Sequence, residues 1–269
     1  MKKNIRRIFA LILVLMLSFS LASCGKKEEE EASKDLLETI KERGYIVIAT
    51  EGGWSPWTYH DENDVLTGYD VELGKLIAEK LGVEARFEET AWEAILAGVD
   101  SGRFDIACNG VGYTEERAEK YYFSDPYLYT TAVLMVRGDN TDITCFEDLD
   151  GKVTANSVGS TYASKAESYG ATVENVDTLG ETITLLLQGR IDATINARVS
   201  YEDYMKEHPD ADIKIVDEAT TDVTCIPVKM ADESKTLVEA INKAIAELIA
   251  DGTLGKLSVQ FFGADLTKG

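Results

Sequence analysis

Residues 108–126 read Cys-Asn-Gly-Val-Gly-Tyr-Thr-Glu-Glu-Arg-Ala-Glu-Lys-Tyr-Tyr-Phe-Ser-Asp-Pro, directly after an apolar run that predicts a buried strand. Gly110 and Gly112 leave bare backbone that another group can approach closely. Thr114 is suited to begin a short helix, because its hydroxyl can accept a hydrogen bond from the first turn. Arg117 lies one turn further on, and its planar pair of donors matches a carboxylate. The stretch therefore predicts either a carboxylate clamp or a surface arginine paired with a neighbouring acid.

The pattern of apolar residues around this stretch predicts alternating strands and helices. Strands are expected at 45–49, 85–88, 103–108, 130–137, 152–155, 171–176, 192–195, 213–216 and 223–228. Helices are expected at 33–43, 70–81, 91–98, 161–168, 181–188, 199–207, 237–250 and 254–262. Such alternation favours an α/β fold with a largely parallel sheet.

The motif at 110–117, Gly-x-Gly-x-Thr-x-x-Arg, and the run Phe-Ser-Asp-Pro-Tyr at 123–127 resemble the signature of bacterial solute-binding protein family 3. Members of this family bind amino acids for ABC importers, and the resemblance extends over residues 34–265. It implies a two-lobed type II periplasmic-binding-protein (Venus flytrap) fold with two crossover strands.

The family topology also implies the boundaries of the two lobes. Lobe 1 would contain residues 34–135 and 223–269, and lobe 2 would contain residues 136–222. The chain would cross between them near 131–135 and again near 224–228. Open α/β sheets bind ligands at the carboxyl ends of their strands, so the loops there should form the site.

The resemblance implies which residues would contact the carboxylate end of a ligand. In the family, an arginine at the place of Arg117 holds the ligand α-carboxylate. Gly110 would present a backbone carbonyl to the ligand, and Gly112 a backbone N–H. Thr161 would cap the next helix and face the other side of the carboxylate, although a helix cap alone explains it equally well.

Aromatic residues and one acid are further candidates for the site. Trp54 and Trp92 occupy loop positions where relatives place an aromatic ring against the ligand, with core packing as the alternative. Trp57 is expected to pack in the core. Glu51 stands where relatives often have an acid that contacts the polar end of the ligand, and a solvated loop acid is its alternative.

The segment 189–198 departs from the family pattern. It resembles a strand that ends in Asn-Asp in the family, where the aspartate usually binds the ligand ammonium, and here Ala197 takes that position. The period of two predicts that Asn196 points to the opposite face of the strand. Glu51, another nearby acid or ordered water would then serve the ammonium, unless the ligand is not a plain α-amino acid.

The first residues have the pattern of an export signal. Four basic residues precede an apolar run at 8–17 that is shorter than the roughly 20 residues of an ordinary membrane span. Leu-Ala-Ser-Cys at 21–24 resembles a bacterial lipobox, which implies removal of residues 1–23 and lipidation of Cys24. An uncleaved anchor or an ordinary signal peptide is the alternative. Residues 24–33 should form a flexible tether to the outer face of the membrane.

Charge and cysteine content exclude several classes of protein. Removing residues 1–23 takes away four positive charges and no acid, so the formal charge changes from −21 to −25. Such an acidic chain argues against nucleic-acid binding, which requires basic patches. Apart from the lipidated Cys24, three cysteines remain, Cys108, Cys145 and Cys225, and none has metal-ligand spacing. They are predicted to be small core residues, with one disulfide left open, and neither a metal nor a cofactor is expected.

These observations imply a substrate-binding lipoprotein of an ABC importer rather than an enzyme. Its lobes would close around a polar amino acid and present it to the permease subunits. The alanine at 197 and the tryptophan pair favour cystine or another bulky amino acid. The alternatives are a ligand sensor and an enzyme on the same fold that resembles cyclohexadienyl dehydratase. The enzyme would need a buried acid or base over the ring, and no histidine lies near the expected site.

Overall fold

The computed structural model describes residues 34–268, apart from the side chains at positions 220 and 221. The predicted signal peptide, Cys24 and the tether at 24–33 fall outside the described residues. Across residues 34–268, no helix combines the length and the apolar character that a bilayer crossing requires.

Lobe 1 is built on a five-stranded sheet with the strand order β5-β1-β6-β13-β7. Its strands are β1 (Tyr45–Thr50), β5 (Glu84–Glu89), β6 (Ile106–Ala107), β7 (Tyr121–Phe123) and β13 (Pro227–Lys229). β1 pairs in parallel with β5 and β6, whereas β13 pairs antiparallel with β6 and β7. A strand from the C-terminal part of the chain therefore completes the sheet.

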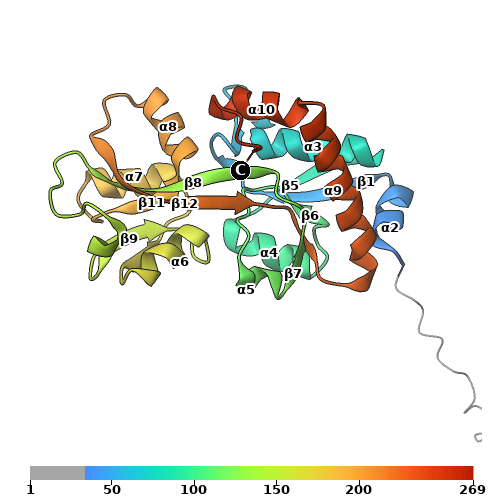
Figure 1. Cartoon of the computed structure of the whole chain (residues 1–269), viewed down its shortest axis with the longest axis horizontal. Helices are drawn as coiled ribbons and strands as arrows, with labels where there is room; N and C mark the ends of the chain where they lie inside the picture. The colour runs from blue at the N-terminus through green and yellow to red at the C-terminus, as the bar shows by residue number, and fades with distance from the viewer. Residues whose placement is uncertain (1–33, 269) are drawn as a thin grey trace, which may run out of the picture. The chain divides into compact units, whose positions relative to one another are not determined.

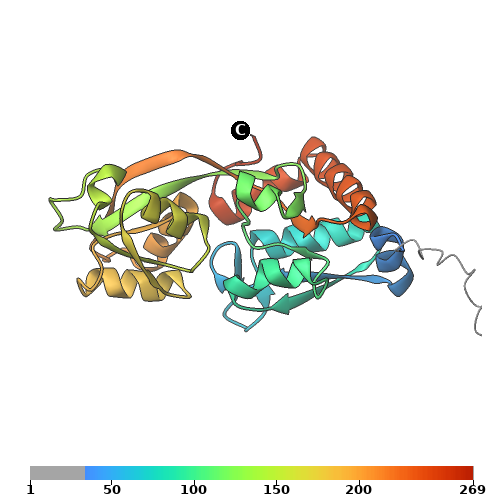
Figure 2. The ribbon, with the colours of Figure 1, turned by 90° about the horizontal axis from the view of Figure 1, so that it is seen from below.

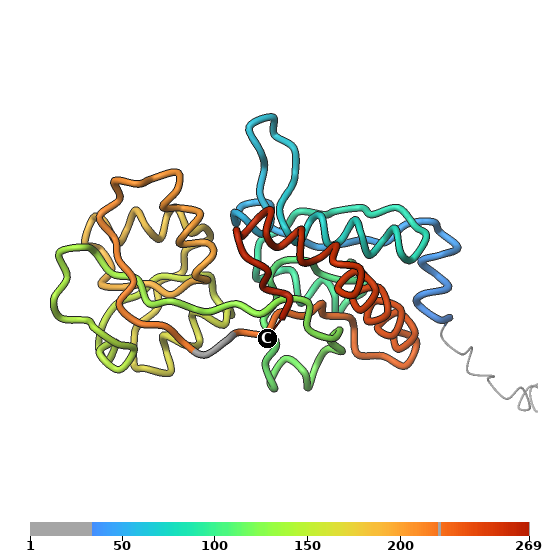
Figure 3. The backbone as a smooth tube through the Cα atoms, turned by 45° about the horizontal axis from the view of Figure 1, so that its top comes forward, coloured from blue at the N-terminus to red at the C-terminus, as the bar shows by residue number. Residues whose placement is uncertain are grey.

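A small antiparallel sheet follows β1 and comprises β2 (Gly53–Trp54), β3 (Thr58–His60) and β4 (Leu66–Thr67). The turn between β3 and β4 extends away from the rest of the lobe (Figure 3). The helices of lobe 1 are α2 (Leu36–Arg43), α3 (Tyr69–Leu81), α4 (Trp92–Asp100), α5 (Glu115–Ala118), α9 (Lys235–Ala250) and α10 (Thr253–Phe262), with the short 3₁₀ helix η2 (Asp232–Ser234).

The core of lobe 1 forms where helices pack on the five-stranded sheet. Ile48 of β1, Leu73 and Ile77 of α3 and Ile241 of α9 are fully buried in one cluster. Burying each such side chain contributes roughly 1.5–3 kcal/mol. The apolar stripe predicted for residues 70–81 is therefore the face by which α3 packs against the sheet.

Lobe 2 contains two smaller groups of strands. β9 (Val153–Asn156) and β10 (Thr172–Asn175) are parallel, and β11 (Thr194–Ala197), β8 (Leu128–Arg137) and β12 (Ile213–Thr224) form an antiparallel sheet in that order. Its helices are α6 (Thr161–Ser168), α7 (Leu179–Leu187) and α8 (Arg198–Glu207), with the 3₁₀ helix η1 (Phe146–Leu149). Two buried clusters pack on the two faces of β8 in this lobe.

Two long strands, β8 and β12, connect the lobes. They pair antiparallel from Leu128 opposite Thr224 to Arg137 opposite Ile213, and both run from one lobe to the other (Figures 1 and 2). The sequence predicted separate extended runs at 213–216 and 223–228. The structure instead has one irregular strand at 213–224, and β13 already belongs to the sheet of lobe 1. Pairing with β8 satisfies the backbone of β12 along this length, which local patterning cannot reveal.

The three cysteines in this part of the chain, Cys108, Cys145 and Cys225, are all free. The disulfide that the sequence left open does not form. Cys108 and Cys225 are buried, as predicted for small core residues, and Cys145 is half-buried.

Candidate functional site

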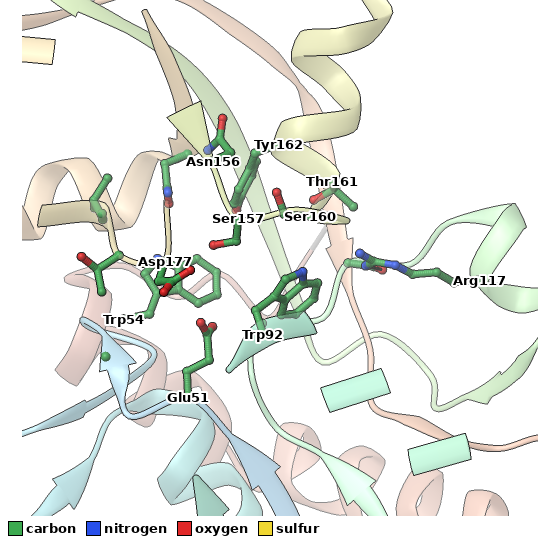
Figure 4. Close-up of a pocket in the computed structure, with 16 residues that line it drawn as sticks. Glu51, Trp54, Trp92, Arg117, Asn156, Ser157, Ser160, Thr161, Tyr162 and Asp177 are labelled. Carbon is green, nitrogen blue, oxygen red and sulfur yellow. Dashed lines mark hydrogen bonds between the residues drawn. The ribbon is translucent and has the colours of Figure 1, made fainter. Parts of the chain in front are cut away.

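Residues of both lobes line a pocket with about 550 Å³ of space free of protein atoms, part of it open to solvent. Seven of the eight residues predicted for the ligand lie in its wall: Glu51, Trp54, Trp92, Gly110, Gly112, Arg117 and Thr161. The other lining residues were not predicted: Gly53, Asn156, Ser157, Ser160, Tyr162, Asp177, Thr178, Leu179 and Asn196. Figure 4 shows the main polar and aromatic side chains around this pocket.

Arg117 is held at the wall by a local helix cap and by backbone carbonyls. The Thr114 hydroxyl accepts a hydrogen bond from the Arg117 N–H at 3.1 Å, so Thr114 begins α5 as predicted. The guanidinium donates to the carbonyl of Gly112 at 2.7 Å and to that of Gly159, in lobe 2, at 2.9 Å. Burial lowers the pKa of Arg117.

The remaining donors of Arg117 are available to a ligand. Within residues 34–268, no carboxylate forms an ion pair with this side chain, so the predicted alternative of a surface ion pair does not occur. The guanidinium carbon lies 5.3 Å from the centre of the Trp92 ring, which favours a cation–π contact. The arrangement leaves a desolvated cation whose fork can receive an anion.

The two glycines allow close approaches that a side chain would prevent. Gly110 has a positive φ of 57°, and a Cβ there would lie 2.6 Å from a ring carbon of Trp54. A Cβ at Gly112 would lie 3.2 Å from the Thr161 methyl group, so this glycine brings lobe 1 against lobe 2. The Gly110 N–H donates to the buried carboxylate of Asp70, which fixes the turn. The Gly112 carbonyl is already occupied by Arg117.

Thr161 lies in the pocket wall but does not cap its helix. The cap of α6 is Ser160, whose hydroxyl accepts a hydrogen bond from the Ala163 N–H at 3.1 Å. Thr161 is the first helical residue. The predicted capping role was therefore wrong by one position, because Ser160 has the extended backbone that a cap requires.

An aromatic group forms one wall of the pocket. Trp54 stacks on Trp57 with ring centres 5.0 Å apart and meets Tyr162, from lobe 2, edge-on at 6.4 Å. Trp57 is 1% exposed and packs in the core, as predicted. The indole Nε1 of Trp54 is buried and has no hydrogen-bond partner among the described residues.

Glu51 lies in the pocket wall, held by one amide side chain. Asn109 donates from Nδ2 to Glu51 Oε2 at 2.6 Å, and its Oδ1 accepts the Glu51 N–H at 2.8 Å. Burial, with smaller contributions from the charges of Glu93 and Asp177, raises the pKa of Glu51 to about 7. The alternative of a freely solvated loop acid therefore does not describe this residue.

The structure corrects the predicted orientation at the end of β11. Ala197 is fully buried and does not line the pocket, whereas Asn196 does. Asn196 Oδ1 accepts the Ala197 N–H at 2.9 Å. The strand stops here and α8 begins, with Ala197 as its N-cap residue. The two side chains still point to opposite sides, as alternation predicts, but Asn196 and not Ala197 faces the pocket.

Several lining residues missed by sequence reasoning follow strand ends in lobe 2. Ser157 comes directly after β9, and Asp177 and Thr178 come soon after β10. The rule that ligands bind at the carboxyl ends of parallel strands points to these loops. Asn156 is itself the last residue of β9, so the same rule reaches it, whereas Tyr162 on α6 carries no comparable signal.

Comparisons with known proteins agree with this geometry. Residues 46–264 match the model for bacterial extracellular solute-binding proteins, family 3. The L-cystine-binding protein TcyA of Bacillus subtilis is 37% identical over 269 residues, covering 98% of this chain and 99% of the relative.

Two solved structures extend the comparison. An ancestral arginine-binding protein bound to arginine is 34% identical, with a TM-score of 0.76, covering 82% of this chain and 99% of its own. The L-cystine solute receptor of Neisseria gonorrhoeae, in its unliganded open conformation, is 40% identical with a TM-score of 0.59, covering 88% of this chain and 100% of its own.

Proposed function

Because the chain belongs to the family 3 bacterial extracellular solute-binding proteins, we propose that it binds a polar amino acid outside the cytoplasm and delivers it to an ABC permease. L-cystine is the first candidate ligand. The cystine-binding protein of B. subtilis and the cystine receptor of N. gonorrhoeae both match over nearly all of their length. The matched relatives are binding proteins, which favours binding over turnover.

The proposal rests mainly on Arg117. Its guanidinium is desolvated in the pocket wall, two of its N–H groups are held by carbonyls, and no acid in residues 34–268 neutralises it. A ligand carboxylate would supply the missing anion with two parallel hydrogen bonds. Ser157 and Thr161 add hydroxyl groups from lobe 2 to the same pocket. These contacts support a site for the α-carboxylate of an amino acid.

The arrangement of the lobes supports a mechanism in which the ligand closes the cleft. In the structure the lobes are already in contact, for example through the Arg117 bond to the Gly159 carbonyl. The fold also matches the arginine-bound protein with a higher TM-score than the open cystine receptor, although the latter has the higher identity. A ligand that bridges both lobes would stabilise this closed form for recognition by the permease.

The lobe boundaries and the anchor belong to the same proposal. We propose residues 34–135 with 223–269 as lobe 1 and residues 136–222 as lobe 2, with the first boundary inside β8, whose residues 132–135 already pack in the clusters of lobe 2. The lipobox-like Leu-Ala-Ser-Cys at 21–24 supports a lipid on Cys24, which would hold the protein on the outer face of the membrane.

A ligand screen on the purified protein tests the function. Thermal unfolding is followed with each of the twenty amino acids and with L-cystine, and each hit is titrated by calorimetry. A ligand at about 100 times its Kd should stabilise the fold by about 2.7 kcal/mol, because it binds only the native state. We expect L-cystine to give the largest shift, with one site per chain. Absence of binding for every compound would reject the proposed function.

A further inference from the structure

Two carboxylates from opposite lobes lie at one end of the pocket. Glu51 follows β1 in lobe 1, and Asp177 follows β10 in lobe 2. Figure 4 shows both on the side of Trp92 that is away from Arg117. The pocket therefore separates its cation from its acids, with aromatic rings between them.

Asp177 is exposed to solvent, and its carboxylate has no partner among the described residues. Among residues 34–268, neither a cation nor a hydrogen-bond donor contacts its carboxylate. Glu51 has only the single amide donor from Asn109 for its side chain. The cleft thus places two acids near one another without a positive charge between them. Burial mainly raises the pKa of Glu51, and the charges of Glu93 and Asp177 add to this effect. Repulsion of this kind opposes closure of the empty cleft.

Further polar groups show that this pocket is built for a polar ligand, independently of the acids. Asn196 is only 8% exposed and lines the cavity. Its Oδ1 accepts the Ala197 N–H, whereas its Nδ2 has no partner in the described part of the chain. The buried indole N–H of Trp54 also lacks an acceptor there. Unpaired buried donors are costly, so a ligand that supplies acceptors would relieve them.

Resting on the proposed function, we propose that Asp177 is a specificity-determining residue that binds, together with Glu51, a second cationic group of the ligand. The ligand class is then α-amino acids whose side chain ends in an ammonium or guanidinium group. Arg117 receives the α-carboxylate at one end, and the two acids receive the distal cation at the other. L-cystine carries an ammonium at its distal end, separated from the first α-carbon by five chain atoms, and a second carboxylate beside it.

This arrangement also explains how such a ligand would close the cleft. A cation between Glu51 and Asp177 replaces their repulsion by two attractive contacts, one to each lobe. An amino acid with a neutral side chain reaches the same cavity but leaves the two acids unpaired. Discrimination between these ligands therefore depends on the lobe 2 carboxylate as well as on the lobe 1 carboxylate.

Two redox-inert probes isolate the distal charge. L-2,7-diaminoheptanoate and L-2-aminooctanoate have side chains of equal length, one ending in an ammonium and the other in a methyl group. Calorimetry measures both affinities for the wild-type protein and for Asp177→Asn, Glu51→Gln and the control Glu174→Gln. Glu174 is an exposed acid on β10 that does not line the pocket. L-cystine is titrated in parallel.

We expect the wild-type protein and the control to favour the diamino probe by about tenfold or more, the scale of one charge-assisted hydrogen bond. Asp177→Asn should reduce this preference several-fold, while affinity for the methyl probe stays constant or rises. Equal affinities for the two probes, or equal losses for both in Asp177→Asn, would overturn the inference and leave the proposed function standing.

If neither probe binds while L-cystine does, the affinity of the Asp177→Asn protein for L-cystine tests the inference instead. A loss that is absent from Glu174→Gln supports the inference, and an unchanged affinity refutes it. Failure of L-cystine and of every amino acid in the screen would instead reject the proposed function itself.

Discussion

The indole Nε1 of Trp57 lies 3.2 Å from the hydroxyl oxygen of Ser200 and donates a hydrogen bond to it from lobe 1 to lobe 2. A second hydrogen bond also joins lobe 1 to lobe 2, because the Ser55 hydroxyl donates to Asp203 Oδ2 at 2.7 Å. Ser200 and Asp203 both belong to α8, so this helix rests on the loop that carries Trp54. The two hydrogen bonds link the lobes directly.

Removing one of these bonds should weaken ligand binding. Ser55→Ala leaves the loop and the aromatic stack in place but deletes the donor to Asp203. We expect an affinity loss of about 0.5–1.5 kcal/mol, the net value of one hydrogen bond, because only the closed form makes it. Calorimetry with the best ligand of the screen measures the loss. Ser168→Ala, on the exposed end of α6, serves as the control. An unchanged affinity in Ser55→Ala would show that the bond also persists in the open form.

Replacing Arg117 should abolish recognition of the carboxylate. Arg117→Ala removes a half-buried cation that a ligand anion would pair with and desolvate further, and we expect a loss of roughly 2–5 kcal/mol in binding free energy. Arg117→Lys keeps the charge without the planar fork, so its loss should be smaller yet clear. Calorimetry measures both, with Arg190→Ala as a control outside this pocket. Near-native affinity in Arg117→Ala would refute the clamp.

The candidate site was predictable where a local motif determines the geometry. Thr114 and Arg117 are three residues apart, so a helix cap alone places the guanidinium beside Gly112. Which of Asn196 and Ala197 faces the pocket was not predictable in this way, because it depends on how β11 is placed in the sheet of lobe 2. The strand-end rule identifies the loop of Asp177 after β10, but local sequence does not show that Asp177 shares a pocket with Glu51 of the other lobe. The long pairing of β12 with β8 was not predictable from local sequence either, because the two strands are distant in the chain.

Asp70 should make stability depend on pH. Burial raises its pKa to about 7, above an ordinary value of 3.8. Between these values the unfolded chain releases the proton while the folded chain keeps it, so stability falls as pH rises, by up to about 4 kcal/mol. Asp70→Asn can still accept the Gly110 N–H but cannot titrate. Urea unfolding at pH 4 to 7 should therefore show wild-type stability falling relative to this variant. A constant difference across the range would contradict the expectation.

Cys24 should carry the lipid anchor, as the lipobox-like sequence predicts. Bacteria expressing the full chain are fed a labelled fatty acid, and the protein should incorporate it and remain with the membrane. Cys24→Ala should lose the label and be released, because no other thiol lies in a lipobox. Cys145→Ala, which changes a half-buried thiol elsewhere, is the matched control. Continued labelling of Cys24→Ala would rule out this anchor.

Restoring the family aspartate with Ala197→Asp should harm the protein rather than improve its binding. Ala197 is fully buried in the cluster that also contains Val199, and its backbone N–H is already bound by Asn196. A carboxylate there would be an uncompensated buried charge, which costs about 3–5 kcal/mol. Urea unfolding should show this loss, and calorimetry should show no gain in affinity. Ala197→Ser, a smaller polar change at the same place, should cost less. A variant that is as stable as wild type and binds more tightly would mean that residue 197 reaches the ligand ammonium when the cleft closes.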